Sequence, residues 1–367
     1  MDLDINSVSV KKEYPNGDVY EGIIIKDLKE VKGTLIRNKK NAFKRDLNSA
    51  IEKKKIIFYC ADMEASKKKF PDEKINGNDI FFYEGDKYEG EFNKDKIHGK
   101  GIMTWRNGNK YEGEFNKDQI HGKGIMTWKN GNKYEGEFKN NFFDGEGKLE
   151  FASHSNYIGQ FVEGMQTGKG VFTYSNGDKF DGQWKNGLKE GNGVYLYHNG
   201  DQYKGQWKND FKDGKGVCTY VNKDVYDGDW KKNMKDGKGV YIYNNGDKYD
   251  GEWANDQKEG RGVYTYQNGD SYTGEWKNDK HEGYGVFTFS NGDKYEGEWK
   301  KNKREGEGKF YSKKGRYEGE YKNDLKEGKG CIFYTNGNMY DGYFNKNYKV
   351  KGLGVLYDKF GNIIEED

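Results

Sequence analysis

The chain repeats one phrase of about eleven residues along most of its length. The phrase reads NGDKYEGEWKK at residues 291–301, NGDKYDGEWAN at 245–255 and NGNKYEGEFKN at 130–140. The aromatic residue of its Y-x-G motif recurs every 23 residues from Tyr88 to Tyr295, and again at Tyr317 and Tyr340. A fixed period of this length is the signature of repeat architectures, in which each repeat is one supersecondary unit that stacks on its neighbours. The period therefore predicts an array of similar units in place of ordinary globular domains.

The repeats divide the chain into four predicted regions. Residues 1–36 hold one degenerate copy around Tyr20, and residues 37–80 form a basic insert without the repeat. Residues 84–362 hold twelve contiguous copies, and residues 363–367 form a short acidic tail.

Each copy is predicted to fold as a β-hairpin. In the first strand Tyr249, Gly251 and Trp253 alternate with charged residues and therefore share one face. In the second strand the two glycines of a Gly-x-Gly motif are expected on that same face. Eight of the contiguous copies end in Asn-Gly, a dipeptide that favours a type I′ turn because both central residues need positive φ.

The glycines are expected to leave space for aromatic rings. A strand glycine leaves a gap one side chain deep, over which a neighbouring ring packs. The positions assigned this structural role are Tyr226, Gly228, Trp230, Gly237, Gly239, Tyr249, Gly251, Trp253, Gly260 and Gly262. The predicted fold class is all-β: an elongated, single-layer antiparallel sheet of stacked hairpins, solenoid-like, with one helix in the N-terminal segment.

The charges are balanced and are expected on the opposite face. The chain has 63 Lys and Arg against 61 Asp and Glu, a formal net charge of +2. Such a balance argues against a nucleic-acid partner. Acidic residues follow the repeat tyrosine (Glu89, Glu112, Glu135, Asp250, Glu296), and basic residues lie inside Gly-x-Gly (Lys100, Lys123, Lys169, Lys215, Lys238, Arg261). They form either cross-strand ion pairs or a simple solvated face.

The pattern G-x-x-Y-x-G-x-W followed by G-x-G-x-x-x-Y-x-x-G resembles the MORN repeat (membrane occupation and recognition nexus). The resemblance implies hairpins stacked into one twisted sheet. It further implies a scaffold at a membrane–cytoskeleton junction, a cilium or a cell cortex, and a tendency to form dimers. Some relatives carry a lipid kinase or methyltransferase domain, for which this sequence has no room.

No motif for catalysis stands out from the repeats. The recurring G-K-G-V has no phosphate-loop spacing, and neither a G-x-S-x-G elbow nor a CxxC pair occurs. We therefore expect a protein that is not an enzyme, without catalytic residues, cofactor or metal site.

The basic insert is the one segment where positive charge accumulates. Residues 37–80 hold twelve Lys or Arg against seven Asp or Glu, a net of +5. Phe43 and Leu47 follow helical spacing beside basic residues, namely Lys39, Lys40, Lys44, Arg45, Lys53, Lys54 and Lys55. Such a helix would contact an anionic membrane or a partner. Alternatively it caps the end of the repeat sheet.

The functional prediction is a non-catalytic scaffold that organises a membrane–cytoskeleton, cortical or ciliary assembly through protein–protein contacts. The alternatives are a phospholipid-binding module and a regulatory subunit of an enzyme. The expected location is the cytoplasm, at the cytoskeleton, cell cortex, cilium or membrane periphery. A homo-dimer is expected through the unpaired edge of the last copy, residues 340–357.

Overall fold

The computed structural model describes residues 7–13, 19–25, 28–36, 77–83 and 85–366. These residues form strands and turns, with no helix among them. The all-β prediction is therefore confirmed for the described residues. The predicted helix in the insert falls within residues 37–76, which lie outside the described residues.

The strands are regular in length and spacing. The first eleven are β1 Ser7–Glu13, β2 Val19–Ile25, β3 Leu28–Ile36, β4 Gly77–Tyr83, β5 Asp86–Asn93, β6 Lys96–Thr104, β7 Lys110–Asn116, β8 Gln119–Thr127, β9 Lys133–Lys139, β10 Phe142–Glu150 and β11 Asn156–Val162. The next nine are β12 Met165–Thr173, β13 Lys179–Lys185, β14 Leu188–Leu196, β15 Gln202–Lys208, β16 Phe211–Thr219, β17 Val225–Lys231, β18 Met234–Ile242, β19 Lys248–Ala254 and β20 Gln257–Thr265. The last nine are β21 Ser271–Lys277, β22 Lys280–Thr288, β23 Lys294–Lys300, β24 Lys303–Ser312, β25 Gly315–Lys322, β26 Leu325–Tyr334, β27 Met339–Asn345, β28 Tyr348–Tyr357 and β29 Ile363–Glu366.

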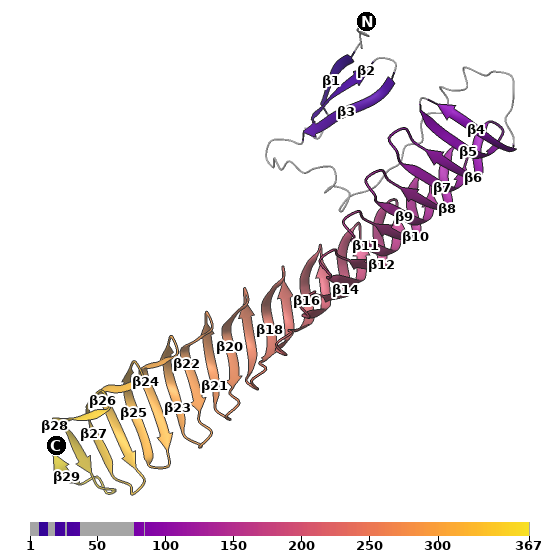
Figure 1. Ribbon diagram of the computed structural model, residues 1–367. Helices are drawn as coiled ribbons and strands as arrows, with labels where there is room; N and C mark the ends of the chain where they lie inside the picture. Colours follow the sequence, from indigo (N-terminus) through magenta and orange to yellow (C-terminus); the bar gives the residue numbers. More distant parts are fainter. Residues whose placement is uncertain (1–6, 14–18, 26–27, 37–76, 84, 367) are drawn as a thin grey trace. The chain divides into compact units, whose positions relative to one another are not determined.

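The chain divides into two compact units. The first comprises Met1–Gly170 and Lys185–Gly187, and the second comprises Val171–Trp184 and Leu188–Asp367. In both units, hairpin follows hairpin in chain order (Figure 1). The substantial contacts between described strands join only consecutive strands, all of them antiparallel. This arrangement confirms the predicted single layer of stacked antiparallel hairpins.

The turn that joins the two strands of a repeat has the positive φ angles of a type I′ turn. Asn255 and Asp256, between β19 and β20, have φ of 48° and 68°. Most other repeats place an Asn, Asp, Lys or Gly pair with positive φ at the same point. Two-residue loops of this kind form type I′ turns, because the twist of such a turn matches the twist of the strands that it joins.

The Asn-Gly turn between repeats differs from the prediction. At Asn245-Gly246 only the glycine has positive φ, 94°. The N–H of Gly246 donates to the carbonyl of Tyr243 at 2.9 Å, and the N–H of Tyr243 donates to the carbonyl of Asp247 at 2.9 Å. These bonds define a longer loop, a type I turn closed by a glycine bulge. The type I′ prediction for this dipeptide is therefore wrong.

The polar residues of the Asn-Gly-Asp phrase connect successive turns. The Asn245 side-chain oxygen accepts the N–H of Asp247 at 3.0 Å. The carboxylate of Asp247 accepts the N–H of Gln267, twenty residues later in the next turn, at 2.8 Å. It also accepts the hydroxyl of Tyr264 at 2.7 Å. The Asn-Gly-Asp motif therefore stabilises its own turn and links it by hydrogen bonds to the turn of the next repeat.

At the two ends of the repeat series, the strand pairing differs in detail from the prediction. The last residues of the predicted insert, Gly77 to Ile80, belong to β4, which pairs with β5. The predicted open edge at residues 340–357 is partly covered, because β29 pairs with β28 at Val355, Leu356 and Tyr357.

Candidate protein-interaction surfaces

A ladder of glycines runs across the hairpins of each unit. In the second unit Gly228 lies opposite Gly239, Gly239 opposite Gly251, and Gly251 opposite Gly262. Every strand of these hairpins contributes one glycine to the ladder. The separate sheet β1–β3 contains the same kind of pair, Gly22 opposite Gly33.

The repeat tyrosine packs directly over this ladder. A Cβ atom on Gly251 would lie 2.5 Å from the Tyr249 hydroxyl oxygen and 2.6 Å from the Cα of Gly262, closer than side-chain atoms can pack. Tyr249 is fully buried, with 0% of its surface exposed. Its hydroxyl donates to the carbonyl of Glu252 at 2.9 Å. We call the side of the sheet that carries Tyr249 and Trp253 the aromatic face.

Tryptophans complete the aromatic packing in the second unit. Tyr249 meets Trp253 and Trp276 edge-on, with ring centroids 5.2 Å and 5.1 Å apart. The indole N–H of Trp253 donates to the carbonyl of Gly239 at 3.1 Å. Edge-to-face pairs contribute about 0.5–1.5 kcal/mol each beyond the burial of area. Each hairpin is thereby held to the next by rings from both.

The first glycine of Gly-x-Gly has a backbone role that the sequence did not reveal. Gly237 and Gly260 have φ of 112° and 62° and lie in β-bulges. A Cβ on Gly237 would meet Asp229 at 2.8 Å, not a ring. The Asp229 carboxylate accepts the N–H of Lys238 at 3.0 Å, which satisfies the backbone of the bulge. Glycine is needed at Gly237 and Gly260 for positive φ, while the register still sets Gly237 opposite Trp253 and Gly260 opposite Trp276.

A row of cations lies on the aromatic face of the second unit. Its members, at equivalent positions of successive repeats, are Lys189, Lys212, Lys235, Lys258, Arg304, Lys326 and Lys349. The Nζ of Lys235 lies 4.6 Å from the Trp253 ring and 5.0 Å from the Tyr241 ring. The corresponding residues in the first unit include Ile97 and Ile120, both buried.

Burial affects the ionisation of this row. It lowers the pKa of Lys235, and the nearby carboxylate of Asp256 acts in the opposite direction. His281 replaces a cation in one repeat and stacks on Tyr272 with centroids 3.6 Å apart. Burial, with a smaller contribution from Lys258, lowers the pKa of His281 to about 4. His281 is therefore neutral at pH 7.

The opposite side, which we call the polar face, carries base–acid pairs. Lys238 lies opposite Glu252 and Arg261 opposite Glu275 across adjacent strands. Lys215 forms an ion pair with Asp229 at 2.7 Å. The basic residues inside Gly-x-Gly thus lie opposite acidic residues of the adjacent strand. These acidic residues come directly after the glycine of the Y-x-G motif, and not directly after its tyrosine as predicted.

The acidic residues that follow the tyrosine pair within their own strand. Each forms an ion pair of 2.7 to 3.2 Å with a lysine two residues earlier: Glu89 with Lys87, Glu112 with Lys110, Glu135 with Lys133, Asp250 with Lys248 and Glu296 with Lys294. Exposed pairs of this kind stabilise a fold by less than about 1 kcal/mol each.

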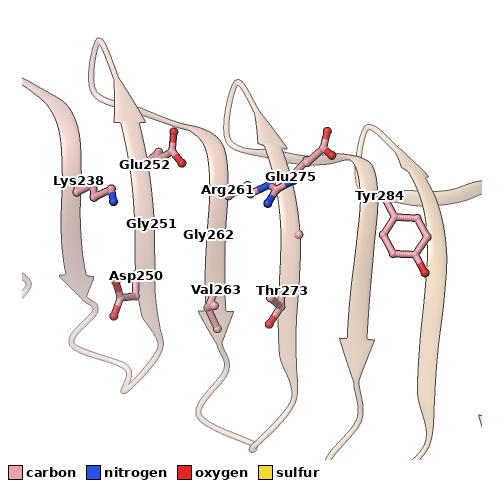
Figure 2. A pocket seen from close by; sticks show the side chains of 11 residues that line it. Lys238, Asp250, Gly251, Glu252, Arg261, Gly262, Val263, Thr273, Glu275 and Tyr284 are labelled. Carbon is pink, nitrogen blue, oxygen red and sulfur yellow. The ribbon is translucent and has the colours of Figure 1, made fainter.

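Shallow hollows open along the polar face above the glycine ladder. One, of about 610 Å³, has Gly251 and Gly262 at its floor. Figure 2 shows Lys238, Glu252, Arg261 and Glu275 on one side of this floor, with Asp250, Val263 and Thr273 on the other side. A second hollow of about 450 Å³ begins at Tyr284 and includes Glu307 and Glu320.

The predicted contact residues of the insert, Lys39 to Lys55, lie outside the described residues. In the part of the chain that the structure describes, no group of three or more His, Cys, Asp or Glu is placed to hold a metal ion. The described residues include no helix long and apolar enough to cross a membrane.

Sequence reasoning missed the cation row and the connecting aspartates. The signal was present, because Lys189, Lys212, Lys235 and Lys258 recur at the repeat period. A lysine in a polar loop is ordinarily read as solvated, and only the structure shows it lying over rings.

These features define a repeat protein built from stacked antiparallel hairpins with an aromatic and a polar face. The profile of the MORN repeat matches eleven successive segments, residues 88–110, 111–133, 134–155, 157–179, 180–202, 203–225, 226–248, 249–271, 272–294, 295–315 and 317–339. The matched segments cover more than half of the sequence, and the chain belongs to the MORN-repeat family. Proteins of this family are associated with interaction scaffolds and are typically non-catalytic.

Comparison with curated proteins returns no match. Among solved structures, the TCP domain of SAS-4 (dCPAP) of Drosophila melanogaster, in complex with a proline-rich motif of Ana2 (dSTIL), is 13% identical. The alignment covers 53% of this chain and 86% of that chain, with a TM-score of 0.25. A streptogramin B lyase structure is 12% identical over 79% of this chain and 94% of that chain, with a TM-score of 0.13.

Proposed function

We propose that this protein is a non-catalytic scaffold that binds other proteins through its repeat hairpins. The supporting observation is the equivalence of the hairpins, which place the same positions of every repeat on the same face. Because the glycine ladder fixes the register, the exposed side chains form a series of adjacent contact sites on a rigid backbone. Variation at those sites then decides which partner binds where.

The proposed partners are proteins of a cytoskeletal or cortical assembly. The proposed location is the cytoplasm, at the cytoskeleton, cell cortex, cilium or membrane periphery. We further propose a homo-dimer through the last hairpin, where β28 has unpaired backbone groups beyond its short pairing with β29.

Proximity labelling in the native cell tests the scaffold directly. The chain is fused to a biotin ligase, and the labelled proteins are compared with those of Lys238→Glu/Arg261→Glu. The matched control is Lys238→Gln/Arg261→Gln, which removes the charge without reversing it. We expect a reproducible set of neighbours, reduced most by charge reversal. The reversal sets like charges opposite Glu252 and Glu275 and should lower the melting temperature somewhat, so labelling is compared at a temperature where every variant is folded. A chain that labels no reproducible set would contradict the proposal.

Anionic phospholipid binding stays a second prediction, based on the +5 charge of residues 37–80. Each basic residue near an acidic surface contributes about 1 kcal/mol, and the effect is screened by salt. Flotation with phosphatidylserine liposomes should show salt-sensitive binding of the full chain and none of a variant that lacks residues 33–78. Equal binding of both would place the lipid site in the repeats.

A further inference from the structure

One stretch of the polar face breaks the base–acid pairing. Along the row beside the glycine ladder, base and acid alternate from Lys215 to Glu275. The next cross-strand pair is Tyr284 opposite Glu298. The one after that is Glu307 opposite Glu320. Two successive repeats therefore lack the basic residue, and three carboxylates follow one another on adjacent strands.

This arrangement costs stability. Like charges directly opposite each other on neighbouring strands repel. Glu307 is exposed and forms no ion pair with any described residue. Among the described residues, Glu320 accepts the backbone N–H of Lys329 at 3.1 Å and forms no ion pair. A destabilising departure from the base–acid pairing of the three preceding repeats indicates a functional site.

The same place has a hollow and an exposed ring. The hollow of about 450 Å³ is lined by Tyr284, Glu307, Glu320 and further side chains of β22 to β26. Tyr284 is 57% exposed, although the equivalent residue is charged or amidic in most other repeats. The ring lies where the two hollows of the second unit meet, since it lines both of them.

The ion pairs around the hollow leave two of its carboxylates without a cation. Four glutamates line it, Glu296, Glu307, Glu318 and Glu320, against two lysines, Lys309 and Lys329. Lys294 pairs with Glu296, and both Arg316 and Lys309 pair with Glu318. Glu307 and Glu320 form no ion pair with any described residue, and Lys329 is the one lining cation that is not paired elsewhere among the described residues.

We propose that this hollow binds an extended, arginine-containing segment of another protein, with a guanidinium group held by Glu307 and Glu320 and stacked on Tyr284. The guanidinium supplies the cation that Lys or Arg supplies within other repeats. Its planar fork matches a pair of carboxylates, and it stacks on aromatic faces better than an ammonium group does. An extended chain fits because the shallow floor above the glycine ladder runs across successive strands.

The probe is a fluorescein-labelled peptide of about eight residues that alternates alanine and arginine, so that one side of the extended peptide faces the hollow in any register. Binding to the full chain is measured by anisotropy at low salt and compared with an alanine–glutamine peptide. We expect the arginine peptide alone to bind.

The discriminating variant is Glu307→Lys, which gives Glu320 the base–acid pairing of the three repeats before Tyr284. It should fold at least as stably as the unaltered chain and bind the peptide about tenfold more weakly, as expected when one charge of a close pair is reversed. Tyr284→Lys should also weaken binding. The matched control is Glu146→Lys, at the equivalent position opposite Gln160, which should leave binding unchanged.

The proposal is overturned if Glu307→Lys melts normally and binds the peptide as well as the unaltered chain. It is equally overturned if Glu146→Lys weakens binding as much. This inference deepens the scaffold function, but its test uses a synthetic peptide and purified protein. Failure here would leave the proximity-labelling test of the scaffold untouched.

Discussion

Single residues with unusual backbone angles carry local strain. Lys223 and His154 replace the glycine of the inter-repeat turn and have φ of 73° and 70°. The equivalent Gly246 has φ of 94°. A residue with a Cβ in this region is strained, by about 1 kcal/mol or more. The bonds that close the turn persist, because the N–H of Lys223 still donates to the carbonyl of Tyr220 at 2.8 Å.

The first prediction is that Lys223→Gly stabilises the protein. Relief of the strain should raise the free energy of unfolding by about 1 kcal/mol. The reverse change, Gly246→Lys, should lower it by a similar amount. Urea titrations of both variants check this, and a Lys223→Gly variant that unfolds at lower urea than the unaltered chain would disprove the strain.

The second prediction concerns pH and His281, which is only 6% exposed. Its pKa falls from 6.5 in the unfolded chain to about 4 in the folded chain. Below pH 6.5 the unfolded state therefore binds a proton that the folded state does not. Stability falls as the pH drops from 6.5 to 4, by up to about 3 kcal/mol.

His281→Gln isolates this effect, because Gln166 occupies the equivalent position in another repeat. The variant should lose the extra stability difference between pH 7 and pH 4.5. The check is a pair of chemical denaturation series at those two pH values. Identical pH dependence in both proteins would mean that His281 takes up its proton without cost.

At the scale of the element, the hairpin depends on glycines with two different functions. Gly251 is needed because Tyr249 and Gly262 leave no space for a side chain. Gly260 is needed because its φ of 62° lies in a bulge. The third prediction is that Gly251→Ala destabilises the chain by about 2–3 kcal/mol through overpacking. Lys238→Ala, on the polar face, should change stability by less than about 0.5 kcal/mol.

Thermal unfolding of the two variants side by side checks the assignment of faces. If Lys238→Ala lowered the melting temperature as far as Gly251→Ala does, the packing of Tyr249 over the glycine ladder could not be the source of stability.

The sequence allowed the hairpin and its aromatic face to be predicted, because the alternation of Tyr249, Gly251 and Trp253 has a period of two. It did not show the type of the Asn-Gly turn, since the same dipeptide fits loops of two lengths. It also did not show that Gly237 and Gly260 need positive φ. A bulge adds residues to one strand, and alternation of residue types does not reveal it.

The interaction surfaces were less predictable than the fold. Lys235 looks like a solvated loop residue until the partner rings Trp253 and Tyr241 are placed beside it. The sequence shows that Glu307 stands at the position where Lys215, Lys238 and Arg261 stand in other repeats. The meaning of this change requires the register that sets Glu307 opposite Glu320.

At the scale of the whole molecule, the hairpins act as modules. The substantial contacts of each described strand are with the strands next to it in the chain. Stability is then a sum of terms within repeats and between neighbours, as in other repeat proteins. One complete repeat can therefore be removed without disturbing the pairing of the others, provided that the cut preserves strand direction and register.

Deletion of residues 226–248, one complete repeat, is the most direct test of this claim. It joins Val225 to Tyr249 and keeps the order of strands antiparallel. Thermal unfolding followed by circular dichroism should show a cooperative transition within a few degrees of the unaltered chain. Deletion of residues 234–247 removes β18 with the turn that follows it and joins β17 to β19 through a short loop. These two strands run in the same direction, and neighbouring parallel strands need a long crossover connection, so that variant should melt far lower. If the two deletions lowered the melting temperature equally, the stacked-hairpin account would be contradicted.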